Sequence, residues 1–368
     1  MSLEKQIEKA RKEIVSDGYD MSIGEVMNLY RDDELVIDPE FQRYFRWKPY
    51  QKTRFIESLL LGIPIPPIFV FQTKDGTWEL IDGLQRLSTV LEFAAMLKKP
   101  DGELAEPTLV EGTKLLPALS GKRWDPSTPE THDGIGKAQQ LQIKRARIRV
   151  EILKMESDPH AKYELFQRIN TGGSQLSEQE VRNCTAIMLN RDFHQWLLEC
   201  SSNNDFLETV RQTDNSAKRQ YNVELALRFF AYRNIPYNNT LDVHEYLDGA
   251  LIDMATKDNI DLAKEKDIFQ KTFALLSKTL GEDTFKRWDG NKFLGMFLLS
   301  VYEIMATGVS KNIEAIEAIP DDKRGIFILA KAKALWNDPI FQKNSGAGVR
   351  GTTRLSNLLP LAEDFFKP

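Results

Sequence analysis

The stretch Thr77-Trp78-Glu79-Leu80-Ile81-Asp82-Gly83-Leu84-Gln85-Arg86-Leu87 decides the fold of the N-terminal half of the chain. Its first six residues favour a β-strand, and Asp82-Gly83 is typical of a tight turn. After the turn, apolar residues recur at helical spacing, at Leu84, Leu87, Val90, Leu91 and Ala94. The stretch therefore predicts a strand, a turn and a helix in immediate succession.

Regular structure is also predicted on both sides of this stretch. A β-rich run at 67–72 and the turn at Asp75-Gly76 predict a hairpin with the strand at 77–82. The other expected elements are a capped helix from Ser22 and Glu25 to Tyr30, a strand at 35–37, a helix from Pro49 to Gly62, an irregular insertion at 99–136, a strand at 147–155 and a helix at about 159–169.

Strand signals stop after Asn170-Thr171-Gly172-Gly173, where Ser177 and Glu180 have the spacing of a second capping box. Helical patterns then continue at 223–232, 268–280, 291–306 and 326–336. The sequence predicts an α+β fold with two domains, an N-terminal α+β domain at 1–185 and an all-α domain at 186–368.

Composition limits the classes of function. The chain has 368 residues with a net charge of −5, so no overall basic field draws it to nucleic acid. Its two cysteines form no CxxC pair, and its longest apolar stretches are far shorter than the roughly 20 residues that span a bilayer. We expect a cytoplasmic protein without a membrane role.

The corner at residues 82–86 has the chemistry of an anion site. A strand that ends in a tight turn before a helix directs backbone N–H groups and the positive end of the helix dipole at one point. Gly83 allows close approach of a phosphate, and Gln85 and Arg86 offer donors to its oxygens. Asp82 is a candidate ligand for Mg²⁺ or for a water. The alternative is an ordinary turn followed by a solvated Arg86, and the residues alone leave both readings open.

A family resemblance favours the phosphate site. Ile81-Asp82-Gly83-Leu84-Gln85-Arg86 resembles the DGQQR signature of the GmrSD-type restriction endonuclease N-terminal domain family. Three further blocks agree in order, at Pro39-Glu40-Phe41-Gln42-Arg43 with Trp47, at 54–67, and at Phe166-Gln167-Arg168-Ile169-Asn170-Thr171-Gly172-Gly173 with Leu176-Ser177 and Glu180. The resemblance covers about residues 20–185.

The resemblance implies a ParB/sulfiredoxin-like N-terminal domain whose corner binds nucleotide phosphates and, in some relatives, hydrolyses nucleoside triphosphates. Carried onto this chain, it implies catalytic roles for Asp82, Gln85 and Arg86, with Asp82 as the candidate metal ligand. It implies nucleotide binding by Gln42, Arg43, Gly83, Arg86 and Asn170. Leu84 departs from the signature by replacing its first glutamine, which puts catalysis in more doubt than binding. The four scattered histidines show no paired ligand spacing, so we expect no HNH-type nuclease.

Three segments offer cations to phosphate. Residues 41–54 interleave five basic and five aromatic residues, which suits base stacking but equally suits core packing with the cations turned outward. Residues 137–149 are basic and line either a nucleic-acid path or a solvated face. The stretch at 346–351 matches GxGxxG without a preceding strand, so we expect a flexible loop that presents Arg350 and Arg354.

Three functions of different classes remain open. The first is a nucleotide-dependent enzyme or switch, with Mg²⁺ as an optional cofactor, in defence against foreign DNA. The second is a DNA-binding or DNA-nicking protein that uses the same corner for a backbone phosphate. The third is a non-catalytic subunit whose helical domain docks a partner protein.

Overall fold

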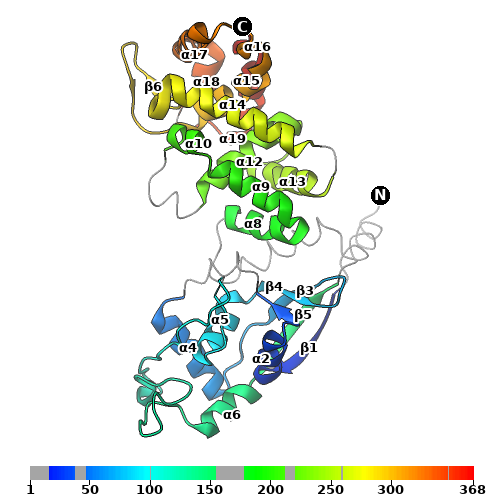
Figure 1. Cartoon of the computed structure of the whole chain (residues 1–368), viewed down its shortest axis with the longest axis vertical. Helices are drawn as coiled ribbons and strands as arrows, with labels where there is room; N and C mark the ends of the chain where they lie inside the picture. The colour runs from blue at the N-terminus through cyan, green and yellow to red at the C-terminus, as the bar shows by residue number, and fades with distance from the viewer. Residues whose placement is uncertain are drawn as a thin grey trace. The chain divides into compact units, whose positions relative to one another are not determined.

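The computed structural model describes residues 16–37, 47–99, 101–154, 178–211, 220–257, 260–346 and 348–368. The chain divides into two compact units, Met1–Ser174 and Gln175–Pro368 (Figure 1). The sequence placed the boundary at 185/186 instead. The difference lies in α8 (Glu178–Leu189), which packs against α9 (Arg191–Ser201) and α13 (Val243–Thr256) of the second unit.

Unit 1 is built on a five-stranded mixed sheet among the residues described, with the strand order β1-β5-β3-β4-β2. The strands are β1 (Ser16–Ser22), β2 (Leu35–Val36), β3 (Ile68–Gln72), β4 (Trp78–Asp82) and β5 (Arg147–Leu153). β1 pairs antiparallel with β5 and β3 with β4, whereas β3 runs parallel to β5 and β2 to β4. The α-helices that the structure describes in this unit are α2 (Ile23–Arg31), α4 (Pro49–Leu61), α5 (Leu84–Phe93) and α6 (Lys137–Arg145).

Local signals in the sequence set most of these bounds. The Ser22 hydroxyl accepts a hydrogen bond from Glu25 N at 3.1 Å and caps α2. Pro49 opens α4, and Gly62 ends it with a left-handed φ of 67°. The β3–β4 hairpin and the helix after Gly83 are confirmed. Within the described part of 99–136, the only helix is the 3-10 turn η1 (Pro117–Leu119), as expected for an irregular insertion.

The sequence did not predict β1. Its residues, Ser-Asp-Gly-Tyr-Asp-Met-Ser, have little β propensity. They form an edge strand because they pair with β5 over the whole length of β1, from Ser16 opposite Leu153 to Ser22 opposite Arg147. Pairing with a distant strand therefore overrides the local preference.

One face of the sheet forms the core of unit 1. Ile68, Val70, Leu80 and Val150 are at most 3% exposed and pack with apolar residues of α2, α4 and α5. This packing holds the end of β4 and the start of α5 in place, and with them the corner at Asp82-Gly83.

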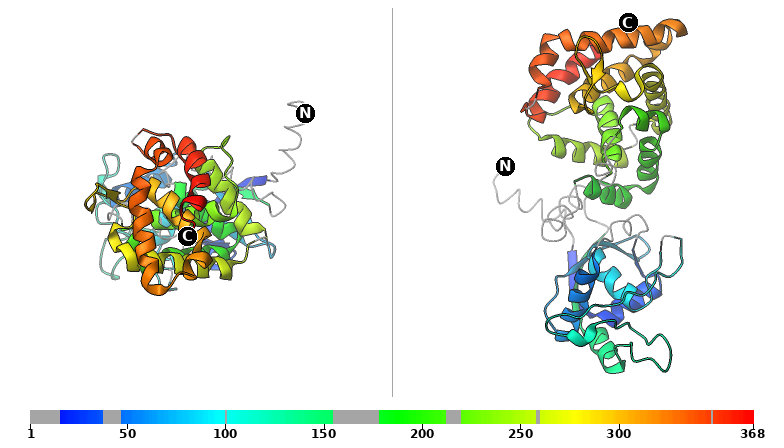
Figure 2. Two further views of the ribbon diagram at one scale, coloured as in Figure 1. Left: turned by 90° about the horizontal axis from the view of Figure 1, so that it is seen from above. Right: turned by 90° about the vertical axis from the view of Figure 1, so that its left-hand side faces the viewer.

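Unit 2 is a helical assembly around a second core (Figure 2). Besides α8, α9 and α13, its α-helices are α10 (Asn204–Thr209), α12 (Tyr221–Asn234), α14 (Leu262–Leu280), α15 (Leu299–Lys311), α16 (Ile313–Glu317), α17 (Asp321–Ala334), α18 (Pro339–Asn344) and α19 (Gly351–Phe365), and its short 3-10 turns are η2 (Gly281–Asp283) and η3 (Leu335–Asn337). The α+β class with a helical C-terminal part is confirmed.

The expectation of purely helical structure in unit 2 is wrong in one place. A small hairpin, β6 (Arg287–Trp288) and β7 (Phe293–Leu294), occupies the start of the helix predicted at 291–306, and α15 begins only at Leu299. Gly290 and Gly295 have φ of 101° and 90°, a conformation that turns the chain and prevents a helix. The helix predicted at 159–169 and Ser177 of the second capping box lie outside the described residues.

Candidate phosphate site

Gly83 forms the corner between β4 and α5. Its φ is 103°, and a Cβ at this position would lie 2.9 Å from Cβ of Ile68 on β3 and still closer to that side chain's Cγ2. A side chain here would therefore be strained by the backbone and would clash with the sheet. Gly83 keeps the first turn of α5 close to the end of β4.

Arg86 closes this corner. Its Nη2 donates to Oδ2 of Asp82 at 2.7 Å and to the carbonyl oxygen of Pro67 at 2.9 Å. The guanidinium thus joins the end of β4 to the residue before β3, and the side chain is 15% exposed. Its Nε is buried and has no hydrogen-bond acceptor in the described part of the chain. A buried cationic donor without an acceptor is costly, so this position favours an additional anionic or polar group.

Gln85 contacts the chain that enters α4. Its Oε1 accepts a hydrogen bond from Trp47 N at 3.0 Å. The Trp47 ring packs edge-on against the Phe55 ring, with 5.6 Å between the ring centroids. The hydrogen bond fixes residue 47 against the first turn of α5. Sequence reasoning missed both Trp47 N and the Pro67 carbonyl, since backbone groups carry no signature of their own.

The structure brings together four of the predicted site residues, Asp82, Gly83, Gln85 and Arg86. Gln42, Arg43 and Asn170 lie outside the described residues, so their nucleotide-binding roles stay predictions. Of the aromatic and basic segment 41–54, the structure describes residues 47–54, where the Trp47 ring packs against the buried Phe55 but Tyr50 is 54% exposed.

Asp82 is the described carboxylate at this corner that could contact a magnesium ion. The described residues form no group of three or more His, Cys, Asp or Glu side chains that could hold a metal. Mg²⁺ is commonly bound by one or two carboxylates together with phosphate oxygens and water. Asp82 therefore fits a metal that arrives with a nucleotide better than a metal held by protein alone.

The prediction that a flexible loop at 346–351 presents Arg354 to phosphate is wrong. This residue lies in the first turn of α19, where Nε and Nη2 donate to the two carboxylate oxygens of Glu303 at 2.6 and 3.1 Å. Arg350 precedes the helix and is exposed. The element that precedes the GxGxxG stretch is α18 and not a strand.

Glu303 belongs to a cluster of buried charges inside unit 2. Its members are Arg182, Glu224, Arg228, Asp248, Glu303 and Arg354. Burial alone would raise the pKa of Glu224, but Arg228 and Arg182 hold that pKa below its ordinary value. The cluster balances three cations against three anions, and each member has an oppositely charged partner within 4 Å.

None of the described helices combines the length and the apolar character needed to span a membrane.

A comparison with curated proteins finds no match for the chain. Residues 23–187 match the family described as "GmrSD restriction endonuclease, N-terminal domain". The matched region contains β2, β3, β4 and β5, the corner at 82–86 and most of α8, whereas β1 lies just before it. Residues 23–187 of this chain are therefore similar to the N-terminal domain of the GmrSD restriction endonuclease family.

Proposed function

We propose that the corner at Asp82-Gly83-Leu84-Gln85-Arg86 binds the phosphates of a nucleoside triphosphate, in a protein of DNA restriction or anti-phage defence. The family description supports the biological setting. The observation that carries the phosphate site is the buried Nε of Arg86 at the N-terminus of α5, a donor for which the described part of the chain provides no acceptor. Helix N-termini and arginine side chains are both suited to phosphate oxygens.

The pair between Asp82 and Arg86 suggests how the ligand would be received. A phosphate beside Arg86 would supply the acceptor that Nε lacks and would compete with Asp82 for Nη2. Asp82, released from Arg86, could then bind Mg²⁺ or a water next to the phosphates. The phosphate thus replaces the Asp82 carboxylate as the partner of the Arg86 guanidinium. This replacement limits the free-energy cost of breaking the salt bridge between Asp82 and Arg86.

Replacing Arg86 with alanine should weaken nucleotide binding by about 1.5–3 kcal/mol, the scale of a lost charged hydrogen bond. Isothermal titration of the full chain with ATP, GTP, CTP and UTP, each with and without Mg²⁺, measures the affinity and identifies the base preferred. Phosphate release in the same samples tests hydrolysis. Asp82→Asn is the companion variant, and it should lose the effect of Mg²⁺ while it keeps binding in the absence of metal.

Arg86 also stabilises the corner, so the fold of each variant has to be checked. Arg86→Lys keeps the charge but loses the planar donor set, and it should bind more weakly than wild type with an unchanged circular-dichroism spectrum. Wild-type affinity in a folded Arg86→Ala protein would refute the phosphate site. Absence of binding by all four nucleotides would leave the DNA-binding or partner-subunit hypotheses.

DNA is the second ligand that the family description favours. Arg350 is exposed at the start of α19, whereas Arg354 is engaged with Glu303. Arg350→Ala should therefore weaken DNA binding and reduce the slope of log K against log salt by about 1, with nucleotide affinity unchanged. Gel shifts with duplex DNA over a series of ionic strengths measure this slope. If Arg350→Ala keeps the wild-type slope of log K against log salt, Arg350 does not contact DNA. If the variant loses nucleotide affinity, Arg350 belongs to the nucleotide pocket instead.

A further inference from the structure

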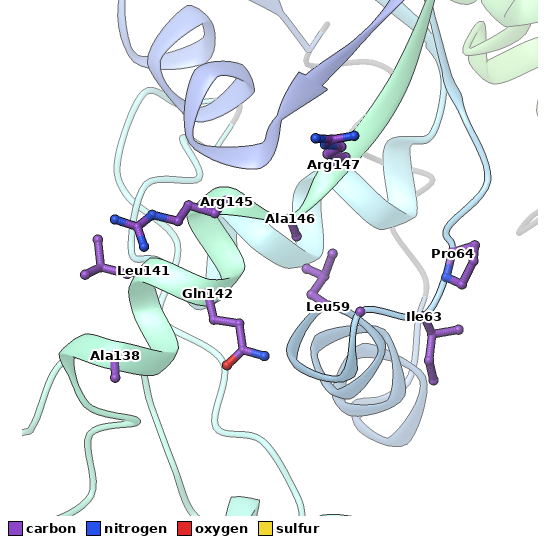
Figure 3. Close-up of a pocket in the computed structure, with 10 residues that line it drawn as sticks. Leu59, Ile63, Pro64, Ala138, Leu141, Gln142, Arg145, Ala146 and Arg147 are labelled. Carbon is purple, nitrogen blue, oxygen red and sulfur yellow. The ribbon is translucent and has the colours of Figure 1, made fainter.

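An open groove lies in unit 1 between the end of α4 and α6. Its volume is about 680 Å³, and its apolar lining comes from Leu59, Ile63, Pro64, Ala138, Leu141 and Ala146 (Figure 3). Ile63 is 46% exposed and Leu141 is 36% exposed. Large apolar side chains that gather in one exposed groove are typical of a surface that binds a partner.

Basic side chains border this groove on one side. Arg145, in the last turn of α6, and Arg147, at the start of β5, both line the groove and are exposed (Figure 3). Neither forms a salt bridge with any residue that the structure describes, whereas Arg149 further along β5 pairs with Glu151 at 2.8 Å. The segment 137–149 contains no acidic residue, although the chain has a net charge of −5. The groove therefore combines an apolar floor with two cations for which the described residues supply no counter-charge.

The groove is held in shape by contacts beneath it. The Gln142 side chain donates a hydrogen bond from α6 to the Leu60 carbonyl of α4. Ile23 N donates to the Ala146 carbonyl at 2.8 Å, and Ile143 on the inner face of α6 is fully buried. A groove whose walls are fixed in advance loses little conformational entropy when it binds a ligand.

We propose that this groove docks a short amphipathic segment of a partner protein, with acidic residues beside its apolar face. Its apolar side chains cover Ile63 and Leu141, and its carboxylates pair with Arg145 and Arg147. A helix that lays its apolar face into such a groove is a common mode of peptide recognition. Phosphodiesters of DNA match the two arginines but bring nothing apolar to cover Ile63 and Leu141, so the groove as a whole fits an acidic amphipathic peptide better. The proposal is independent of the phosphate site.

The test uses the full chain and a defined probe, a fluorescein-labelled amphipathic peptide with leucines along one face and glutamates beside them. Its twin carries glutamine in place of each glutamate. Fluorescence anisotropy should show saturable binding of the glutamate peptide and at least about tenfold weaker binding of the twin. The double variant Arg145→Glu, Arg147→Glu should also lose at least about tenfold, and so should Ile63→Ser, Leu141→Ser, which keeps both cations.

The matched control is Lys74→Glu, Lys114→Glu, which makes the same change of charge at two exposed lysines outside the groove. It should bind the glutamate peptide like wild type, and the melting temperature of each variant confirms that it is folded. Equal affinity for the two peptides, or wild-type affinity in the serine variant, would overturn the proposal. If duplex DNA displaces the peptide and binds the serine variant unchanged, the surface belongs to nucleic acid. A dimer in sedimentation that Arg145→Glu, Arg147→Glu abolishes would make a second copy of the chain the occupant instead.

Discussion

Replacing Arg182 with alanine should lower the free energy of unfolding of unit 2 by about 3–5 kcal/mol, the range seen when one partner of a buried ion pair is removed. The Arg182 side chain is fully buried, and its Nε donates to Oδ1 of Asp248 at 2.6 Å. Its Nη1 lies 3.7 Å from Oε2 of Glu224. Without the guanidinium, two mostly buried carboxylates lose a cation that neutralises them. Urea unfolding, followed by circular dichroism, measures the change.

An exposed ion pair provides the control for this result. Lys266 and Glu199 lie 2.8 Å apart with side chains 35% and 49% exposed, so Lys266→Ala should cost less than about 1 kcal/mol. The double variant Arg182→Met, Asp248→Leu removes both charges of the closest pair and should recover much of the loss. If Arg182→Ala unfolds within about 1 kcal/mol of wild type, the buried cluster contributes little to stability.

Replacing Gly83 with valine should destabilise unit 1 by about 2–5 kcal/mol and abolish nucleotide binding. Backbone strain at positive φ contributes of order 1–3 kcal/mol, and forcing a side chain into packed space adds a similar amount. Here φ is 103° and the new Cβ meets Ile68. The branched side chain would also cover the N–H groups at the start of α5. Thermal unfolding and calorimetric titration measure the two effects separately.

A variant at Gly76, in the β3–β4 turn, distinguishes the destabilisation caused by backbone strain from that caused by a side-chain clash. The φ of Gly76 is 89°, but nothing lies within 4 Å of the place where a Cβ would be. Gly76→Val should therefore cost only the backbone strain and leave nucleotide binding intact. A Gly83→Val protein that binds nucleotide like wild type would show that this turn does not receive the phosphates.

The sequence alone was sufficient for features that depend on neighbouring residues. The cap at Ser22, the stop at Gly62 and the strand, turn and helix around Gly83 all follow from contacts within a few positions along the chain. Family resemblance added the expectation of a phosphate site, and the match at 23–187 supports that family. The roles of the site residues stay predictions, and three of those residues lie outside the described part.

Other features depend on partners far along the chain, and local patterns carry no signal for them. β1 is a strand because β5 pairs with it, although its own residues disfavour that state. From the sequence, we expected Arg354 beside a glycine-rich stretch to be available to phosphate, but its side chain binds Glu303, 51 positions away.

The same contrast holds at the corner. The sequence by itself determined that Asp82, Gly83, Gln85 and Arg86 lie at one tight turn between a strand and a helix, because the strand and helix patterns meet at Asp82-Gly83. Only the tertiary structure decided that Arg86 binds the Pro67 carbonyl and that Gln85 accepts from Trp47, 38 positions away. It also buries Nε of Arg86 where no described residue accepts a hydrogen bond from it. These contacts depend on which strand and which loop the folded chain places beside the turn. Spacing along the sequence encodes hydrogen bonds within a turn, but the path of the whole chain sets which distant groups meet.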